Sequence, residues 1–248
     1  MNPTVAALAS VVGVSLVSLL GVVALVMHRQ FLKKILHVLV SFAAGALLGD
    51  ALIHLLPEAF EYFDGGLTVP LYTIAGILVF FLLEKLVRWH KHHEIDKTDE
   101  PAPIAKILLL GDGLHNFIDG LLIGASYLVS IPLGIATTAA VILHEIPQEI
   151  GDFGVLVHSG YSPRRAMFYN FLSALTAVAG AIVALVTAGQ IENFSAAMLA
   201  VTAGAFLYIA GSDLIPELHK EDKPLTSIIE VLGIVAGVAV MALLTLLE

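Results

Sequence analysis

Polar side chains of types that bind metal ions recur at helical spacing in two apolar segments of the chain. The first segment carries Asp112, His115, Asn116 and Asp119, and the second carries His144, Glu145, Gln148, Glu149 and Asp152. Offsets of three, four and seven residues place side chains on one face of a helix. The i, i+4 pairs that could close on one ion from a single helix are His115 with Asp119 and His144 with Gln148.

The mixture of donor types favours a divalent cation of borderline or hard character. Imidazole, carboxylate and amide ligands suit zinc, iron(II) or manganese and disfavour the soft chemistry of copper(I). The chain has no cysteine, so a thiolate site and a cysteine nucleophile are excluded. Buried carboxylates without basic partners must be protonated, hydrated or neutralised by a bound cation. Protonation alone would not require imidazoles beside them, so the pattern indicates a cation site.

The composition indicates a membrane protein. Of the 248 residues 58% are hydrophobic and only 13% are charged, whereas a soluble domain normally carries about 25% charged residues. The bilayer must therefore be the solvent for most of the chain. The 12 Lys and Arg against 21 Asp and Glu, a formal charge of −9, suit cationic ligands and exclude a basic nucleic-acid surface.

Eight apolar segments are long enough for a helix to cross the membrane, which takes roughly 20 residues. They are predicted near residues 3–27, 35–60, 67–89, 104–129, 132–158, 165–189, 194–218 and 225–247. The whole chain, 1–248, is therefore predicted to be one all-α transmembrane domain with a cytoplasmic, histidine-containing loop at about 90–103. The first segment lacks a basic leader and a cleavage pattern, so we interpret it as a retained helix.

The basic residues predict the orientation. All 12 fall in alternate connections or at the adjoining helix ends, at Arg29, Lys33, Lys34, Lys85, Arg88, Lys91, Lys97, Lys106, Arg164, Arg165, Lys220 and Lys223. Lys and Arg mark the cytoplasmic side of a membrane protein. Both termini are therefore expected outside, in a plasma membrane or a bacterial inner membrane.

An internal repeat relates the second and seventh segments. Residues 43–58 align with 202–217 at an offset of 159, and the identities include the Pro-Glu pairs at 57–58 and 216–217. The two segments cross in opposite senses, so the repeat would be inverted, as is common in secondary transporters with a midplane site and alternating access. Coincidental similarity between two apolar helices is the alternative.

Polar residues near the ends of the repeated segments are candidates for a transport path. His54 and Glu58 lie toward the outer end of the second segment, and Asp213 and Glu217 toward the inner end of the seventh. The alternative is that these side chains face lipid headgroups. The histidines at 90, 92 and 93 could scavenge metal or belong to a solvated linker.

The run from His144 to Gln148 also approaches the His-Glu-x-x-His motif of zinc proteases, in which two histidines hold zinc and the glutamate activates water. Here the second histidine is replaced by Gln148, and Pro147 interrupts the helical turn. One alternative function is therefore that of an enzyme, an intramembrane zinc metalloprotease that uses His144 and Glu145. Another is that of a metal sensor that binds zinc without ion flux.

The polar segments resemble the ZIP (Zrt/Irt-like) family of divalent metal transporters. The resemblance is carried by HNFIDG at 115–120 and HEIPQEIGD at 144–152, with GDALIHLLPE at 49–58 in support. It implies that helices one to three and six to eight form inverted repeats around helices four and five, with a binuclear midplane metal site. Carried over by position, one site would use His115, Asp119, His144 and Gln148, and the other Asn116, Asp119, Glu145, Gln148 and Asn170. Glu149 also matches the motif, in a supporting role at the metal site.

The resemblance implies import of divalent ions, zinc foremost, into the cytoplasm by alternating access, and no enzymatic activity. Fe²⁺, Mn²⁺ and Cd²⁺ are further candidates, because Gln148 stands where the subfamily closest in pattern usually has His, and a neutral amide is a weaker ligand. Asp119 stands where many relatives have Glu. The expected partners are the ions and the lipid bilayer, without nucleic acid, and a homodimer stays open.

Overall fold

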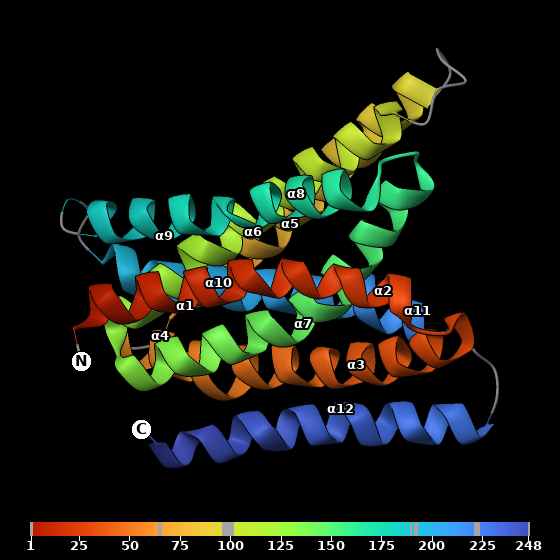
Figure 1. The fold of residues 1–248 in the computed structure, drawn as a ribbon. Coiled ribbons are helices and arrows are strands. Elements are labelled where there is room, and N and C mark those ends of the chain that lie inside the picture. Colours follow the sequence, from red (N-terminus) through yellow and green to blue (C-terminus); the bar gives the residue numbers. More distant parts are fainter. Residues whose placement is uncertain are drawn as a thin grey trace.

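The computed structural model describes residues 2–63, 66–95, 102–188, 190, 193–220 and 224–247, and all of its regular elements are helices (Figure 1). In chain order these are α1 (Pro3–Val17), η1 (Ser18–Val22), α2 (Val23–Val26), α3 (Arg29–Gly49), η2 (Asp50–Leu55), α4 (Leu56–Tyr62), α5 (Thr68–Ile95), α6 (Ala102–Val129), α7 (Ile131–His158), α8 (Pro163–Ala174), α9 (Thr176–Thr187), α10 (Phe194–Tyr208), η3 (Ile209–Leu214), α11 (Ile215–Leu218), α12 (Pro224–Leu244) and η4 (Thr245–Leu247). The all-α prediction is confirmed for this part of the chain.

Each apolar segment of the sequence coincides with one helical stretch, several of them built from two or three consecutive elements. The clearest difference lies in α5, which continues to Ile95 and so includes residues 90–93, predicted to open a loop. The structure does not describe the side chains of residues 90–93. It also does not describe residues 96–101, which belong to the same predicted loop.

Six helical stretches within the described residues are long and apolar enough to cross a membrane. They are Pro3–Val22, Lys34–Tyr62, Thr68–Lys85, Pro163–Thr187, Phe194–Leu218 and Pro224–Leu244. The helices α6 and α7, with 28 residues each, are also long enough for a bilayer, but they carry the polar stripes and are not among the six. This set of helices is that of a multi-pass membrane protein.

Glycines bring α6 and α9 into close contact. A Cβ atom at Gly120 would lie 1.8 Å from the carbonyl oxygen of Ala177, and one at Gly180 would lie 1.8 Å from that of Phe117. Such distances are available only to glycine, as is typical of closely packed membrane helices. This contact fixes the position of α6, the helix that carries one of the two polar stripes.

The two repeated segments share a backbone irregularity at corresponding positions. The π-helical turns η2 and η3, related by the offset of 159, each precede a proline, Pro57 and Pro216. The N–H of Leu56 donates to the carbonyl of Ala51, five residues back, and that of Ile215 donates likewise to Ala210. Proline lacks an N–H and crowds the preceding turn, which the wider π turn relieves.

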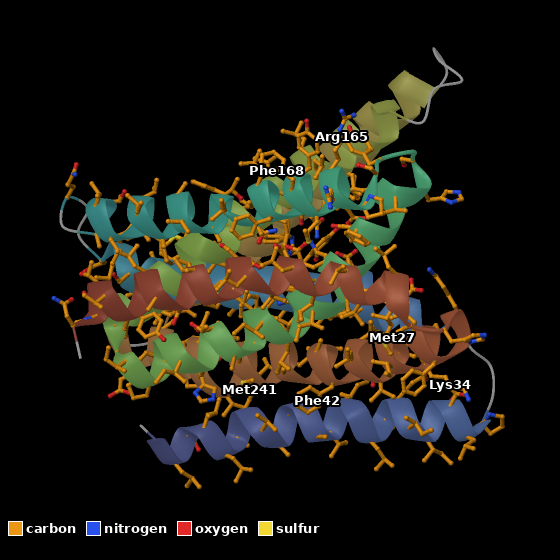
Figure 2. The ribbon with its side chains drawn as sticks, in the orientation of Figure 1. Met27, Lys34, Phe42, Arg165, Phe168 and Met241 are labelled. Atoms are coloured by element: carbon orange, nitrogen blue, oxygen red, sulfur yellow. The ribbon has the colours of Figure 1, made fainter. Side chains whose placement is uncertain are left out.

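The helices that flank the repeated segments also pack in matching ways. A Cβ atom added at any of four glycines would lie about 2 Å from a backbone carbonyl oxygen of the facing helix. The glycines and the residues that own these oxygens are Gly45 and Ile234 (2.0 Å), Gly237 and Phe42 (2.2 Å), Gly204 and Thr73 (2.0 Å), and Gly76 and Val201 (2.1 Å). The first two contacts join α3 to α12, where Figure 2 labels Phe42 and Met241, and the last two join α10 to α5. The offset of 159 relates Gly45 to Gly204 and residue 42 to residue 201.

Candidate metal centre

The helices α6 and α7 form an antiparallel pair that brings the two polar stripes together. Only Ser130 separates them, and its hydroxyl caps α7 by accepting a hydrogen bond from the backbone N–H of Leu133 at 3.2 Å. Figure 1 shows α7 crossing the bundle between α1 and α3, with α6 behind. The polar stripes of the two helices therefore face each other, with Nε2 of His144 directed at Asp119 and Nε2 of Gln148 at Asp112.

Four of these side chains form a cluster, which we call the histidine cluster: His115, Asp119, His144 and Glu145. The Nε2 atom of His144 lies 3.1 Å from Oδ2 of Asp119 and 3.3 Å from Nε2 of His115. Oε1 of Glu145 lies 3.4 Å from the Nε2 atom of each histidine. Two imidazoles and two carboxylates at such separations can share one divalent cation.

The ring of His144 is held so that one nitrogen faces this cluster. Its Nδ1 donates to the carbonyl oxygen of Ala140 at 3.2 Å, which leaves Nε2 directed toward Asp119. A hydrogen bond on the outer ring nitrogen fixes the tautomer and the orientation of a ligating histidine. His144 is 1% exposed, and Phe206 and Phe80 lie edge-on against His144 and His115, so apolar rings border the cluster.

A second cluster, the acidic cluster, consists of Asp112, Glu145 and Glu149. All three are buried, and oxygens of the three carboxylates lie within 4.8 Å of one another. Glu145 belongs to both clusters, so they adjoin. The three acids occupy the same stripes as the histidines, and no histidine belongs to this cluster.

The remaining predicted ligands hydrogen-bond to the acidic cluster. Nδ2 of Asn116 donates to Oδ1 of Asp112 at 3.0 Å, and Nε2 of Gln148 donates to the same oxygen at 3.3 Å. Nδ2 of Asn170, on α8, donates to Oε2 of Glu149 at 2.5 Å. Asn170 also donates to the backbone carbonyls of Glu149, at 3.3 Å, and Ser18, at 3.4 Å, so it ties α8 to α7 and η1.

The four path candidates belong to neither cluster. His54 is buried in η2, where its Nε2 donates to the carbonyl of Met241 at 2.9 Å. Glu58 is exposed and helps to line a cavity of about 450 Å³ between α4, α6, α9 and α10. Asp213 is exposed on η3, and Glu217 on α11 is exposed and paired with Lys220.

Several buried oxygens of the two clusters and of the neighbouring amides accept no hydrogen bond from the described residues. They are Oδ2 of Asp112, Oδ1 of Asn116, Oδ1 of Asp119, both carboxylate oxygens of Glu145 and Oδ1 of Asn170. Leaving a buried polar atom unpaired costs about 1–3 kcal/mol. Within the described chain no Lys or Arg pairs with the acids of either cluster, so the donor set fits a bound cation.

Asp112 belongs to neither ligand set that the family resemblance implies. It lies on the predicted face of α6, three residues before His115 and four before Asn116. The helical spacing marked it as part of the polar stripe, but nothing in the spacing shows that it faces Glu145 and Glu149 of α7. That contact depends on the register between two helices.

Comparison with known proteins agrees with this geometry. The sequence model of a family described as ZIP Zinc transporter matches residues 3–103 and 90–245. Similar proteins include the zinc transporter SLC39A7 of Rattus norvegicus, 33% identical over 309 residues that cover 87% of this chain and 66% of that protein. The zinc transporter ZIP13 of Pongo abelii is 38% identical over 224 residues, covering 84% of this chain and 66% of the relative.

A third relative, the zinc transporter zipt-7.1 of Caenorhabditis briggsae, is 32% identical over 312 residues, or 97% of this chain and 79% of its own length. The chain spans just under two thirds of the SLC39A7 relatives that it matches. The matched residues include both helices of the metal centre and six helices that could span a membrane. The resemblance seen in the sequence is thereby confirmed, and the chain belongs to the ZIP family of zinc transporters, as a multi-pass membrane protein.

Proposed function

We propose that the protein transports divalent transition-metal ions, zinc foremost, across a membrane through the centre between α6 and α7. The observation that carries this proposal is the histidine cluster, in which Asp119, His144 and Glu145 are buried and His115 is partly exposed at the edge. No Lys or Arg among the described residues pairs with it. Charged side chains inside a membrane are costly and mark ion pathways. The relatives named above are zinc transporters.

We extend the six apolar spans to eight by including α6 and α7, whose polar faces meet each other. An even number of crossings agrees with Figure 1, in which the N and C labels lie at the same end of the bundle. Figure 2 labels Lys34 and Arg165 toward the opposite end. Since basic residues favour the cytoplasmic side, this arrangement supports termini outside the cell. The inward direction of transport is taken from the family resemblance.

The inverted repeat supports alternating access. The matching π turns η2 and η3 and the matching glycine contacts of α3 with α12 and of α10 with α5 are what an inverted repeat of helices one to three and six to eight would produce. In such transporters one repeat moves relative to the other around a fixed midplane site. The α6–α7 pair would supply that site.

In this mechanism the ion exchanges hydration water for protein ligands. The imidazoles of His115 and His144 and the carboxylates of Asp119 and Glu145 receive it, with a second ion held as the family pattern implies by Asn116, Asp119, Glu145, Gln148 and Asn170. His54, beside Met241 on the outer half, and Glu58, at the 450 Å³ cavity, would lie on the outer part of the path, and Asp213 and Glu217 on the inner part. Both clusters are complete within one chain, so a second copy is not required for binding.

The protease alternative is not favoured by the geometry of Glu145. A general base must reach a metal-bound water, but Oε1 of Glu145 lies 3.4 Å from both ligand nitrogens and so occupies a ligand position itself. Gln148, where the second histidine of the motif would stand, donates instead to Asp112. The centre is therefore built to bind an ion rather than to cleave a peptide.

The test is flux of radiolabelled zinc into proteoliposomes that contain the purified chain. We expect saturable flux from the wild type and none from the double variant His144→Ala/Asp119→Ala. A matched control, Glu61→Ala/His158→Ala, removes one exposed acid and one exposed histidine outside the centre and should transport like the wild type. Wild-type vesicles without flux, or a double variant that transports normally, would contradict the proposal.

A further inference from the structure

The helix α8 and its continuation α9 have one face that packs on the bundle and one that stays exposed. On the packed face Asn170 and Ser173 are buried, and the hydroxyl of Ser173 donates to the carbonyl of Leu109 on α6 at 3.0 Å. The exposed face is apolar, and its side chains recur at helical spacing. We call it the apolar stripe, and its members, each between 37% and 60% exposed, are Phe168, Leu172, Leu175, Ile182 and Val186.

The apolar stripe ends near a membrane surface. Together α8 and α9 form the candidate span Pro163–Thr187, which has 25 residues. At 1.5 Å per residue it is about 37 Å long, whereas the hydrocarbon of a bilayer is roughly 30 Å thick. Its terminal turns therefore extend into the headgroup region, and its first turn lies toward the end of the bundle opposite the chain termini (Figure 1).

Two adjacent arginines occupy that first turn. Arg164 and Arg165 are exposed, and neither pairs with an acid in the part of the chain that the structure describes. The sequence has no Asp or Glu from residue 153 to residue 191, although the chain carries a formal charge of −9. The stripe therefore ends in a positive patch on an acidic protein, and Figure 2 labels Arg165 and Phe168 close together on α8.

Aromatic rings flank the arginines. The rings of Tyr161 and Tyr169 meet edge to face with centroids 5.6 Å apart, and Phe168 packs against Tyr169 at 5.4 Å. Tyrosine is enriched at membrane interfaces because its ring is apolar and its hydroxyl is polar. Charged, aromatic and aliphatic side chains thus follow one another along the helix, as the phosphate, the interface and the acyl chain do in a phospholipid.

We propose that Arg164, Arg165, Phe168, Tyr169 and Leu172 form a binding site for one anionic phospholipid. The two guanidinium groups bind its phosphate, and one acyl chain follows the apolar stripe. A guanidinium presents its N–H groups in a planar fork that matches two phosphate oxygens. A choline headgroup adds a cation that the arginines repel, so the site should prefer an anionic lipid. This lipid is a ligand distinct from the transported ion.

The site is linked to the metal centre through a single turn of α8. Asn170 follows Tyr169 in the sequence but is buried on the packed face, where its Nδ2 donates to Oε2 of Glu149 at 2.5 Å. A lipid on the exposed face restrains the same turn from the other side. Bound lipid should therefore stabilise the protein, since a ligand that binds only the folded state raises the melting temperature.

The test is a lipid titration of the purified full chain in detergent, in which native mass spectrometry counts the retained lipids. The probes are phosphatidylglycerol and phosphatidylcholine with identical acyl chains. We expect one phosphatidylglycerol to bind saturably, about tenfold more tightly than phosphatidylcholine, and to raise the melting temperature. Arg164→Gln/Arg165→Gln should weaken this binding by about tenfold or more, since each basic residue near an anionic headgroup contributes about fivefold.

The matched control is Lys33→Gln/Lys34→Gln, which removes the same charge from the other adjacent basic pair, toward the same end of the bundle (Figure 2). It should bind phosphatidylglycerol like the wild type. Arg164→Lys/Arg165→Lys keeps the charge but loses the planar fork, so it should weaken binding by about threefold. The arginines are exposed, so their variants should fold, and the melting temperature of each variant without lipid checks this.

Unchanged phosphatidylglycerol binding in Arg164→Gln/Arg165→Gln would overturn the proposal, as would equal affinities of the wild type for the two lipids. Equal losses in the arginine and lysine variants would reduce the site to a general attraction by surface charge. A lipid-free dimer that dissociates in the arginine variant would assign the exposed face to a second copy of the chain instead. None of these outcomes depends on zinc flux, so failure of the lipid site and failure of transport are distinguishable.

Discussion

At the residue scale, the histidine cluster depends on how one ring is held. His144 is fully surrounded by protein, and its Nδ1 is engaged by the carbonyl of Ala140, so its Nε2 is the atom that faces Asp119 and His115. His115 retains more exposure, 16% of its side chain, at the edge of the cluster. The buried, oriented histidine should therefore contribute more to affinity than the partly exposed one.

Replacing His144 by Ala should lower zinc affinity at the histidine cluster by about 100-fold or more, since even losing an outer hydrogen bond to a metal ligand costs about 10–100-fold. His115→Ala should cost less, because water can replace a ligand at the exposed edge. Calorimetric titration of both variants measures the difference. His158→Ala, at the end of α7, is the control and should bind like the wild type. An equal loss of zinc affinity in His115→Ala and His144→Ala would contradict the greater contribution expected from His144.

Gln148→His should shift metal preference toward zinc. A histidine at this position can donate one ring N–H to Asp112, as Gln148 does, and present its other nitrogen to the ion. Nitrogen ligands favour zinc over manganese. We expect the concentration of Mn²⁺ that halves zinc flux to rise by about tenfold. An unchanged competition profile would remove Gln148 from any role in metal choice.

At the element scale, glycine contacts fix how α6 lies against its neighbours. The carbonyl of Ala177 occupies the place of a side chain at Gly120, and the carbonyl of Phe117 does the same at Gly180. Both obstacles are backbone atoms of packed helices, so they cannot move aside as a flexible side chain can. The position of the polar stripe of α6 is therefore tied to α9.

Gly120→Ala should destabilise the protein by about 3 kcal/mol or more, because the added methyl group must force two helices apart. The matched variant Gly13→Ala introduces the same methyl group on α1, where no atom lies within 4 Å, and should leave stability unchanged or slightly raised. Thermal unfolding of both variants in detergent, followed by fluorescence, gives the comparison. Similar melting temperatures for the two would show that the close contact is not rigid.

The sequence was sufficient to predict the helices and their polar faces, because apolar length and helical spacing are local properties. It did not predict that Gln148 would donate to Asp112, or that Glu149 would complete the acidic cluster, since these contacts follow from the register between α6 and α7. The π turns were also not predicted, although Pro57 and Pro216 mark their positions. Their shared offset became informative only when both backbones were seen.

At the scale of the whole molecule, the pairs α3–α12 and α10–α5 make matching glycine contacts. The glycines and carbonyls at their contacts are related by nearly constant offsets, 159 for Gly45 and Gly204 and 161 for Thr73 and Ile234. Matching contacts of this kind are what the proposed inverted repeat requires, and transporters with inverted repeats work by alternating access.

The number and direction of the membrane crossings can be measured with single cysteines, because the chain has none of its own. Asn2→Cys and Leu246→Cys lie at exposed positions near the two ends of the chain, and Ser162→Cys lies in the connection between α7 and α8. With eight crossings and outer termini, an impermeant maleimide added to intact cells should label the first two variants. Ser162→Cys should be labelled only after the membrane is permeabilised.

The unmodified chain gives the background, and labelling of all three variants in permeabilised cells controls for thiol reactivity. Label on Ser162→Cys alone in intact cells would reverse the orientation and, with it, the proposed direction of transport. Label on only one of the two terminal variants would mean an odd number of crossings, so at least one of the eight helical stretches could not span. The inverted repeat would then fail as well, because its two halves must cross in opposite senses.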